Sequence, residues 1–228
     1  MKEKTPAELA QETLETMSLE EKAGQMFCLA FRKTATGSNL LELDQKSKDV
    51  IQTVRPGGIV LFGENVDSVE QIRTFISDSQ DLSAIPLFVS IDQEGGRVQR
   101  IKNTDKIPAT DIPPMLTVGE QDNLIFTRLI GSLIAEELRV FGFNMDFAPS
   151  CDVFSNPQNT VIGNRSFSTD PEIAAEQAAA LADGLSSEGI IPVLKHFPGH
   201  GDTVADDGIL GIGKDIAARR KIHVKRCV

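Results

Sequence analysis

The sequence has little cysteine and no long apolar run, and each shortage narrows the class of protein. Its three cysteines (Cys28, Cys151 and Cys227) are widely spaced and odd in number, which favours reduced thiols over a disulfide framework. No stretch approaches the length of a membrane span. The segment after Met1 is acidic rather than apolar, so no signal peptide is expected. We therefore expect a cytoplasmic protein with no membrane partner.

Positive charge is also scarce. The 23 Lys and Arg residues face 33 Asp and Glu residues, and the net charge of −10 disfavours nucleic acid as a partner. The exception is the segment 214–228, which holds six Lys or Arg residues against one Asp. A basic tail of this kind can bind an acidic partner. No linker or internal repeat divides the 228 residues, which are enough to bury one large core.

Short apolar runs alternate with longer amphipathic stretches along the chain. The runs typical of strands are 23–31, 58–62, 86–91, 143–147 and 190–194. The stretches typical of helices are 40–54, 68–82, 124–141 and the segment from Pro171 to Gly189. Strands buried on both faces and separated by helices predict an α/β fold with a parallel sheet. The pattern leaves open whether that sheet is a closed barrel or a doubly wound open sheet.

Polar side chains stand where three of the predicted strands end. Asp92 follows the run 86–91, Asp146 lies near the end of 143–147, and Lys195 and His196 follow 190–194. The carboxyl ends of parallel strands lie on one side of the sheet, where active sites are built. The sequence therefore predicts a functional site at that edge.

Two of the segments around this site have both a functional and a structural interpretation. Gly95 and Gly96, just after Asp92, could let the backbone approach a ligand, or could serve only a turn. Arg165 lies in a loop of small residues, where a guanidinium can bind a hydroxyl pair or a carboxylate, although a loop arginine more often pairs with a nearby acid.

The segment from Lys195 to Gly201 is the most specific. A lysine and a histidine directly after a buried strand are costly unless they face a polar cavity. His196 and His200 are four residues apart, but Pro198 and Gly199 between them prevent the helix that a zinc motif needs, so we expect no metal. We also expect no cofactor. The glycines of 208–213 have the wrong spacing for dinucleotide binding, and no G-x-S-x-G elbow is present.

Taken together, the motifs resemble glycoside hydrolase family 3, and within it the β-N-acetylglucosaminidase branch. The segments that carry the resemblance are Ser18–Lys22, Pro56–Ile59, Ser90–Arg100, Gly163–Phe167 and Lys195–Thr203. The resemblance implies a (β/α)8 barrel of the TIM type with its site at the C-terminal face. The chain would hold about five or six strand–helix units of it, as the N-terminal part of the barrel domain in residues 1–206.

The resemblance also implies an activity and a set of residues. The family removes terminal β-linked N-acetylglucosamine by a retaining mechanism, here from glycans of the cell-wall type. The implied sugar-binding residues are Asp92, Arg100, Arg165, Lys195 and His196. β-Glucosidases share the fold and the strand-end acid, but the residues that make up the motifs favour N-acetylglucosamine as the substrate.

Aromatic composition adds a constraint on how a sugar would bind. The chain has no Trp and no Tyr, so sugar stacking would fall to phenylalanines such as Phe154, Phe167 or Phe197. A compact pocket for one terminal sugar fits this composition better than a long groove.

The resemblance ends in the segment where the family carries its general acid/base, an Asp-His dyad. Alignment on Gly201-Asp202-Thr203 places the dyad aspartate at Asp206, but Gly208 stands where the histidine is expected. The nucleophilic aspartate belongs to a later strand. We therefore expect a chain that binds the sugar better than it cleaves it, with 207–228 a divergent basic tail of out-of-frame or truncated coding sequence. The alternative is a non-catalytic sugar-binding fragment or degenerate paralogue.

Overall fold

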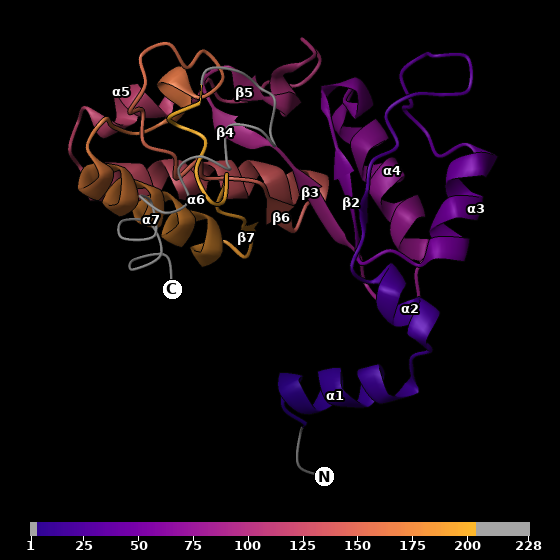
Figure 1. Cartoon of the computed structure of the whole chain (residues 1–228). Helices are drawn as coiled ribbons and strands as arrows, with labels where there is room; N and C mark the ends of the chain where they lie inside the picture. The colour runs from indigo at the N-terminus through magenta and orange to yellow at the C-terminus, as the bar shows by residue number, and fades with distance from the viewer. Residues whose placement is uncertain (1–3, 204–228) are drawn as a thin grey trace.

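The computed structural model describes residues 4–203. Its main sheet has five parallel strands in the order β1-β2-β3-β6-β7 (Figure 1). They are β1 (Cys28–Leu29), β2 (Gly58–Leu61), β3 (Phe88–Ile91), β6 (Met145–Asp146) and β7 (Ile191–Pro192). The predicted α/β class with a parallel sheet is confirmed. Within the described residues β1 and β7 are the outer strands, so the described sheet is not closed into a barrel.

Helices make the crossovers between these parallel strands. They are α3 (Gln45–Val54), α4 (Val69–Asp81), α6 (Leu124–Phe141) and α7 (Pro171–Ser187), which precede β2, β3, β6 and β7 respectively. The sequence pattern did not predict the short helix α5 (Met115–Gly119) or the antiparallel hairpin of β4 (Gln93–Gly95) and β5 (Val98–Gln99). This hairpin follows β3 directly and therefore stands over the C-terminal edge of the sheet.

The predicted ends of the two longest helices agree with the structure because they depend on local signals. Gly142 follows α6 with a φ of 100°, a left-handed conformation that glycine adopts without strain. Asp170 caps α7, since its carboxylate accepts hydrogen bonds of 2.8 and 3.2 Å from the amides of Glu172 and Ile173. Pro171 occupies the first turn, as expected.

The strand predicted over 23–31 is wrong in its first half. Ser18 and Glu21 form a reciprocal capping box that starts the helix α2 (Leu19–Gly24). This helix includes the first two residues of the predicted strand. Only Cys28–Leu29 then pairs with β2. Gly24 ends the helix in a position without space for a side chain, because a Cβ there would lie 2.0 Å from the carbonyl oxygen of Val54.

The helix predicted over 40–54 begins later than expected. Asp44 is its N-cap and accepts a hydrogen bond of 2.8 Å from the amide of Ser47, so α3 starts at Gln45. Leu40 and Leu43, which appeared to extend the helical spacing, instead belong to the core cluster as loop residues. Apolar periodicity alone does not separate these two situations.

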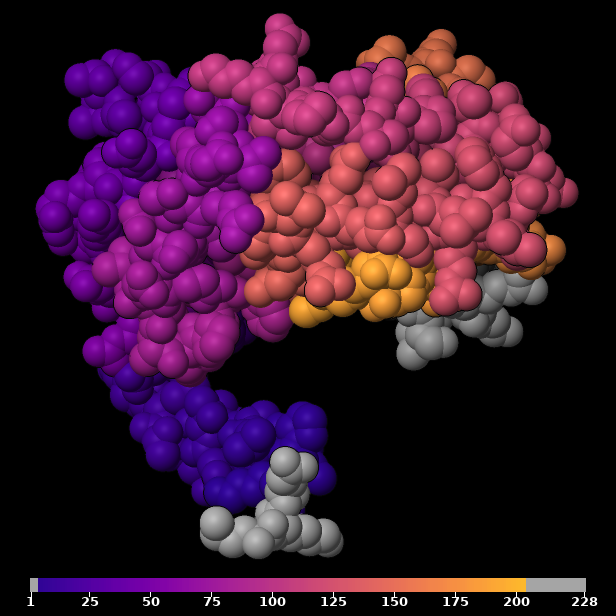
Figure 2. Space-filling view, turned by 180° about the vertical axis from the view of Figure 1, so that it is seen from behind, coloured from indigo at the N-terminus to yellow at the C-terminus, as the bar shows by residue number. Residues whose placement is uncertain are grey.

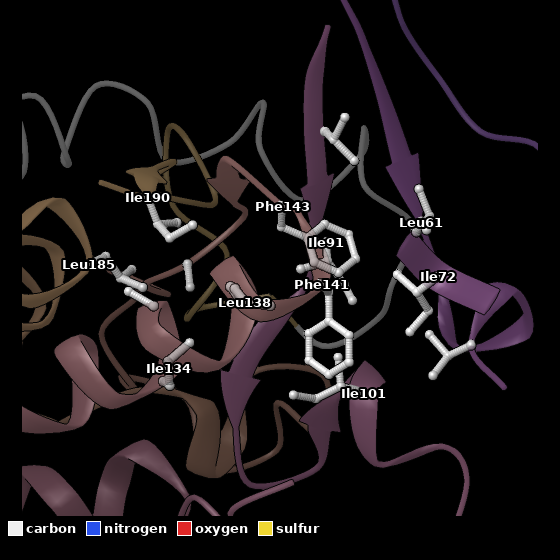
Figure 3. Packing of buried hydrophobic residues seen from close by; sticks show 14 of the residues in the cluster. Leu61, Ile72, Ile91, Ile101, Ile134, Leu138, Phe141, Phe143, Leu185 and Ile190 are labelled. Carbon is white, nitrogen blue, oxygen red and sulfur yellow. The ribbon is translucent and has the colours of Figure 1, made fainter. Parts of the chain in front are cut away.

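The core lies between the sheet and the crossover helices (Figure 3). Ile91 of β3 and Leu138 of α6 are fully buried there. The rings of Phe141 and Phe143 pack edge to face with their centroids 6.3 Å apart, next to Ile91 in Figure 3. This packing fixes β3 and β6 against α6, and therefore fixes the strand ends that carry the polar side chains.

Glycines allow α6 and α7 to pack closely. A Cβ on Gly131 would lie 2.3 Å from the carbonyl oxygen of Leu181, and a Cβ on Gly184 would lie 2.1 Å from that of Arg128. Close by, the Thr127 hydroxyl donates to the buried side-chain oxygen of Gln177. The two helices thus pack closely against each other, and α7 also contacts β7.

The N-terminal helix α1 (Pro6–Thr16) buries none of its residues. It stands apart from the rest of the molecule, and Figure 2 shows the indigo N-terminal segment below the main body. No helix within residues 4–203 is long and apolar enough to cross a membrane. The predicted boundary between residues 206 and 207, the dyad positions Asp206 and Gly208, and the basic tail lie outside the described residues.

Candidate active site

Lys195 brings together the ends of β3 and β7. Its ammonium group donates a hydrogen bond of 2.6 Å to Asp92 Oδ1 and also pairs with Glu94. The side chain of Lys195 is 14% exposed and that of Glu94 is 1% exposed, so both charges are largely removed from water. An ammonium group in such a place is stable because two carboxylates compensate it. The expected convergence of strand-end side chains is therefore present between these two strands.

Arg165 comes from a separate loop and pairs with the same buried acid. Its Nε and Nη2 each donate a hydrogen bond of 2.8 Å to one oxygen of Glu94. This bidentate geometry is the strong form of an arginine–carboxylate pair. Nη1 donates to the carbonyl oxygen of Val161 at 3.1 Å, which anchors the loop that carries Arg165. Of the two interpretations left open by the sequence, the pairing with a nearby acid is the one observed.

Arg100 is the most open member of the group. It lies in a 3-10 turn after β5, and its Nη2 is 3.6 Å from Asp92 Oδ2. Its side chain is 34% exposed, compared with 17% for Asp92. Asn103 holds this turn by donating a hydrogen bond of 2.8 Å to the carbonyl oxygen of Gly63. The strand-end cluster, as we call Asp92, Glu94, Arg100, Arg165, Lys195 and His196, therefore opens to solvent at Asp92 and Arg100.

His196 connects the cluster to a second buried acid. Its Nε2 lies 3.2 Å from Arg165 Nη2, and its Nδ1 lies 2.5 Å from Asp152 Oδ2. Asp152 is fully buried, and its other oxygen accepts a hydrogen bond of 2.5 Å from the amide of His200. All five sugar-binding residues implied by the resemblance thus lie in one continuous arrangement with Glu94 and Asp152.

Burial raises the pKa values of these acids, and their positively charged partners act in the opposite direction. For Glu94, desolvation raises the pKa, but the hydrogen bonds from Arg165 and the charge of Lys195 outweigh it and the pKa is lowered overall. The pKa of Asp152 is lowered in the same way, because the hydrogen bond and charge of His196 outweigh desolvation. Both residues are therefore carboxylates at neutral pH.

Asp146 is the exception among the strand-end acids. It is fully buried at the end of β6, and desolvation raises its pKa well above the ordinary value although the amide of Gln93 donates to its Oδ1 at 2.9 Å. Its Oδ2 has no hydrogen-bond partner among the described residues. The raised pKa of Asp146 thus contrasts with the lowered pKa values of Glu94 and Asp152.

The sequence analysis did not single out Glu94 or Asp152. The strand alternation contained a signal for the first, since residues two apart face the same side of an extended chain and Glu94 stands two after Asp92. Asp152 is harder to find. The segment after β6 runs beside β7, with the amide of Cys151 donating to the carbonyl oxygen of Lys195 at 2.7 Å, and only this tertiary pairing places Asp152 next to His196.

Gly95 and Gly96 serve the backbone of the β4–β5 hairpin. Both have positive φ values, of 103° and 54°. A Cβ on Gly95 would lie 2.7 Å from the side chain of Met115, and one on Gly96 would lie 2.9 Å from Pro114. The segment that carries α5 therefore covers both glycines, and this packing favours the structural interpretation over close approach of a ligand.

Two loops meet beside His196. Asn159 donates to the carbonyl oxygen of His200 at 2.6 Å and accepts from the amides of Val161 and Ile162. A Cβ on Gly201 would lie 1.7 Å from the carbonyl oxygen of Val153, so only glycine fits at this crossing. The glycine at the end of the Lys195–Gly201 motif therefore allows the loop after β7 to close against the loop after β6.

The phenylalanines considered for sugar stacking differ in their exposure to solvent. Phe167 is 1% exposed and belongs to the core, so it is no surface for sugar stacking. Phe197 is 85% exposed and Phe154 is half-buried, and both remain available for sugar stacking.

The rings of His196 and His200 lie 5.6 Å apart, but residues 4–203 contain no group of three or more His, Cys, Asp or Glu side chains suited to hold a metal ion.

The protein thus has an α/β fold with a parallel sheet and a cluster of charged side chains at the carboxyl ends of its strands. The profile of the glycosyl hydrolase family 3 N terminal domain matches residues 18–222. The chain therefore belongs to glycosyl hydrolase family 3.

Relatives of known name agree with this family. A β-hexosaminidase of Nitrosomonas eutropha is 40% identical over 178 residues, which are 75% of this chain and 48% of the relative. A β-hexosaminidase of Stenotrophomonas maltophilia is 36% identical over 167 residues, which are 72% of this chain and 49% of that protein. The chain thus spans about half the length of these two relatives.

Solved structures give the same result. A family 3 β-N-acetylglucosaminidase from a Paenibacillus species is 33% identical, with a TM-score of 0.76, and the match covers 84% of this chain and 35% of the other. NagZ from Neisseria gonorrhoeae, in complex with N-trifluoroacetyl-D-glucosamine, is 32% identical with a TM-score of 0.66, and the match covers 76% of this chain and 51% of the other.

Proposed function

We propose that this chain carries the sugar-binding part of a retaining glycosidase that removes terminal β-linked N-acetylglucosamine from glycans of the cell-wall type. The observation that carries the proposal is the strand-end cluster, in which Asp92, Arg100 and Lys195 present an acceptor and two donors at the C-terminal edge of the sheet. Sugar hydroxyls both donate and accept hydrogen bonds, so neighbouring hydroxyls fit such a set. The name of the Paenibacillus relative, a β-N-acetylglucosaminidase, supports N-acetylglucosamine as the sugar.

The five residues divide by exposure into two kinds. Asp92, Arg100 and His196 keep between 17% and 34% of their side-chain surface, and we assign them direct contacts with the sugar. Lys195 and Arg165 are 14% and 12% exposed and already bind Glu94. Lys195 would share Asp92 with a sugar hydroxyl, and Arg165 would mainly hold the geometry of the cluster.

For catalysis we propose that the chain binds better than it cleaves. The dyad aspartate aligns with Asp206, and Gly208 stands at the histidine position. Proton transfer by a positioned side chain contributes roughly 10²–10⁴-fold to a rate, so its loss is severe without abolishing binding. The second candidate function is a non-catalytic sugar-binding protein. It is favoured by the fact that the whole strand-end cluster lies between residues 92 and 196, before the dyad segment.

Calorimetry measures the binding of N-acetylglucosamine, and hydrolysis of a chromogenic β-N-acetylglucosaminide measures turnover. Together the two assays test both candidates. We expect binding without turnover. Asp92→Asn should weaken binding about tenfold or more, because hydrogen bonds to charged groups contribute about 1.5–3 kcal/mol. Asp183→Asn on the exposed side of α7 is the matched control and should bind as the unaltered chain does.

The three outcomes separate the proposals. Absence of binding by the folded chain would contradict a sugar site at the strand-end cluster. Turnover by the chain alone would contradict the assignment of Gly208 and support full enzyme activity. Equal binding by Asp92→Asn and the unaltered chain would place the sugar elsewhere.

We also propose the cytoplasm as the compartment. Cys28 is a free thiol in the described part of the chain, which suits a reducing environment. Thiol titration of protein isolated without added reductant tests this, because a disulfide in the native protein would contradict it.

A further inference from the structure

Asp152 carries no role in the sugar site assigned so far, yet four donors converge on it. Oδ2 accepts from the Nδ1 of His196 at 2.5 Å, from the amide of His196 at 3.2 Å and from the hydroxyl of Ser150 at 3.2 Å. Oδ1 accepts from the amide of His200 at 2.5 Å. The carboxylate is fully buried, so water does not compete for these bonds.

These contacts act on the backbone and on the ring together. The two amides lie at either end of the turn His196–His200, so one carboxylate binds both ends of the turn that follows β7. The ring of His196 is bound to the same oxygen as its own amide. Its orientation is therefore fixed by the same group that fixes the turn.

The partners of the ring determine which nitrogen carries the proton. A carboxylate only accepts, so Nδ1 of His196 must be the protonated nitrogen that donates to Asp152. A guanidinium only donates, so Nε2 faces Arg165 Nη2 as an acceptor, at 3.2 Å. The two neighbours, both in the connection between β6 and α7, favour the same neutral tautomer.

We propose that Asp152 is a positioning residue of the sugar site, which holds His196 in the Nδ1-protonated tautomer. Its Nε2 is then an acceptor that Arg165 occupies in this structure and that a sugar hydroxyl can take over. The part concerning sugar rests on the proposed function, while the tautomer does not. A histidine side chain in water prefers the Nε2-protonated form, so the opposite tautomer is a signature of the contacts that the ring makes with Asp152 and Arg165. A residue that only stabilised the fold would leave the tautomer unaffected.

The tautomer can be observed directly by nitrogen NMR. The chain has three histidines, so labelling them with ¹⁵N gives three ring spin systems, and His196→Gln identifies the relevant one. In the unaltered chain at mildly alkaline pH we expect Nδ1 of His196 to be protonated. Finding the Nε2-protonated form there would overturn the proposal without any variant of Asp152.

Variants then connect the tautomer to binding. Asp152→Ala removes the acceptor. Asp152→Asn keeps the size but turns one oxygen into an amide that faces an N–H donor. Both should shift His196 towards the Nε2-protonated form, with Arg165 alone still favouring the original tautomer. Asp152→Ala should weaken N-acetylglucosamine binding by up to about tenfold, the loss expected for one hydrogen bond between neutral groups. Asp183→Asn should change neither quantity.

The two readouts distinguish the possible failures. If the unaltered chain binds no sugar, the proposed function fails and the tautomer alone decides whether Asp152 positions His196. If sugar binds and a folded Asp152→Ala retains both the tautomer and the affinity, the positioning role is wrong. If both Asp152 variants unfold, the tautomer of the unaltered chain still decides.

Discussion

At the scale of single residues, the cluster depends on buried charges that compensate one another. Glu94 is 1% exposed and accepts three hydrogen bonds or ion pairs from Arg165 and Lys195. Breaking a buried ion pair by removing one partner leaves the other charge without compensation, which costs far more than the pair contributes. The arrangement therefore makes Glu94 important for stability as well as for the site.

Glu94→Gln should destabilise the chain by about 3–5 kcal/mol at neutral pH, because two cations remain buried beside a neutral amide. The pKa of Glu94 is lowered in the folded state, so its contribution is present above the ordinary carboxyl pKa, about 4.3, and is lost as pH falls through the lowered value. Urea unfolding of both proteins across the acid range measures this. Glu136→Gln, on the exposed side of α6, is the control and should leave the stability unchanged. An equal difference at pH 7 and at low pH would contradict the argument.

Asp146→Asn should behave in the opposite way. Burial raises the pKa of Asp146 in the folded state, so the stability that its protonated form provides is present below the ordinary aspartate pKa, about 3.9, and is lost as pH rises through the raised value. An asparagine can still accept from the amide of Gln93 and never ionises. The variant should therefore gain stability relative to the unaltered chain as pH rises, and thermal unfolding from pH 4 to 9 measures it. A constant difference would show that Asp146 does not titrate in this range.

The sequence predicted the convergence of strand-end side chains better than it predicted their buried partners. Asp92, Lys195 and His196 follow strands, and the position after a parallel strand is informative without any tertiary knowledge. Asp152 belongs to a loop and contacts His196, which is 44 positions further along the chain. A local sequence pattern carries no information about such a pairing, so Asp152 could be identified only from the folded structure.

At the scale of elements, prediction succeeded where local chemistry decides and failed where packing decides. The ends of α6 and α7 follow from Gly142 and Asp170, which act within their own helix termini. The apolar residues at 40–43 and 23–27 have periodicity compatible with more than one element, and the caps at Asp44 and Ser18 override it. The close approach of α6 and α7 also depends on long-range packing, because each glycine faces a carbonyl of the other helix.

Gly131→Ala and Gly184→Ala test this approach of the two helices. Helix propensity alone would make alanine more favourable by about 1 kcal/mol. The added Cβ would lie 2.3 or 2.1 Å from a backbone oxygen of the neighbouring helix, so each variant should instead lose about 1–3 kcal/mol. Chemical unfolding measures the sign. Ser186→Ala, exposed near the end of α7, reports propensity without packing. Stabilisation by either glycine variant would mean that the helices can separate at little cost.

At the scale of the whole molecule, the outer strands of the described sheet determine how the chain meets its surroundings. Ile191 on β7 is 44% exposed and Leu194 just after it is 40% exposed. At the other edge, Met26 and Phe27 precede β1 and are 87% and 55% exposed. Unpaired strand edges with apolar side chains favour association with other chains. Since the chain spans about half of its relatives, these are the edges where further strands of a barrel would pair.

We therefore expect the chain to associate with itself as its concentration rises, through the edge at β7. Ile191→Lys and Leu194→Lys place charges on that edge and should reduce the association, because a charge on an edge strand opposes pairing. Val140→Lys is the matched control, since Val140 is 56% exposed on α6 and away from the sheet edge. Sedimentation velocity over a range of concentrations measures the outcome. Equal suppression by all three substitutions would point to general surface hydrophobicity, and a chain that stays monomeric at every concentration would show that the exposed edge is already protected.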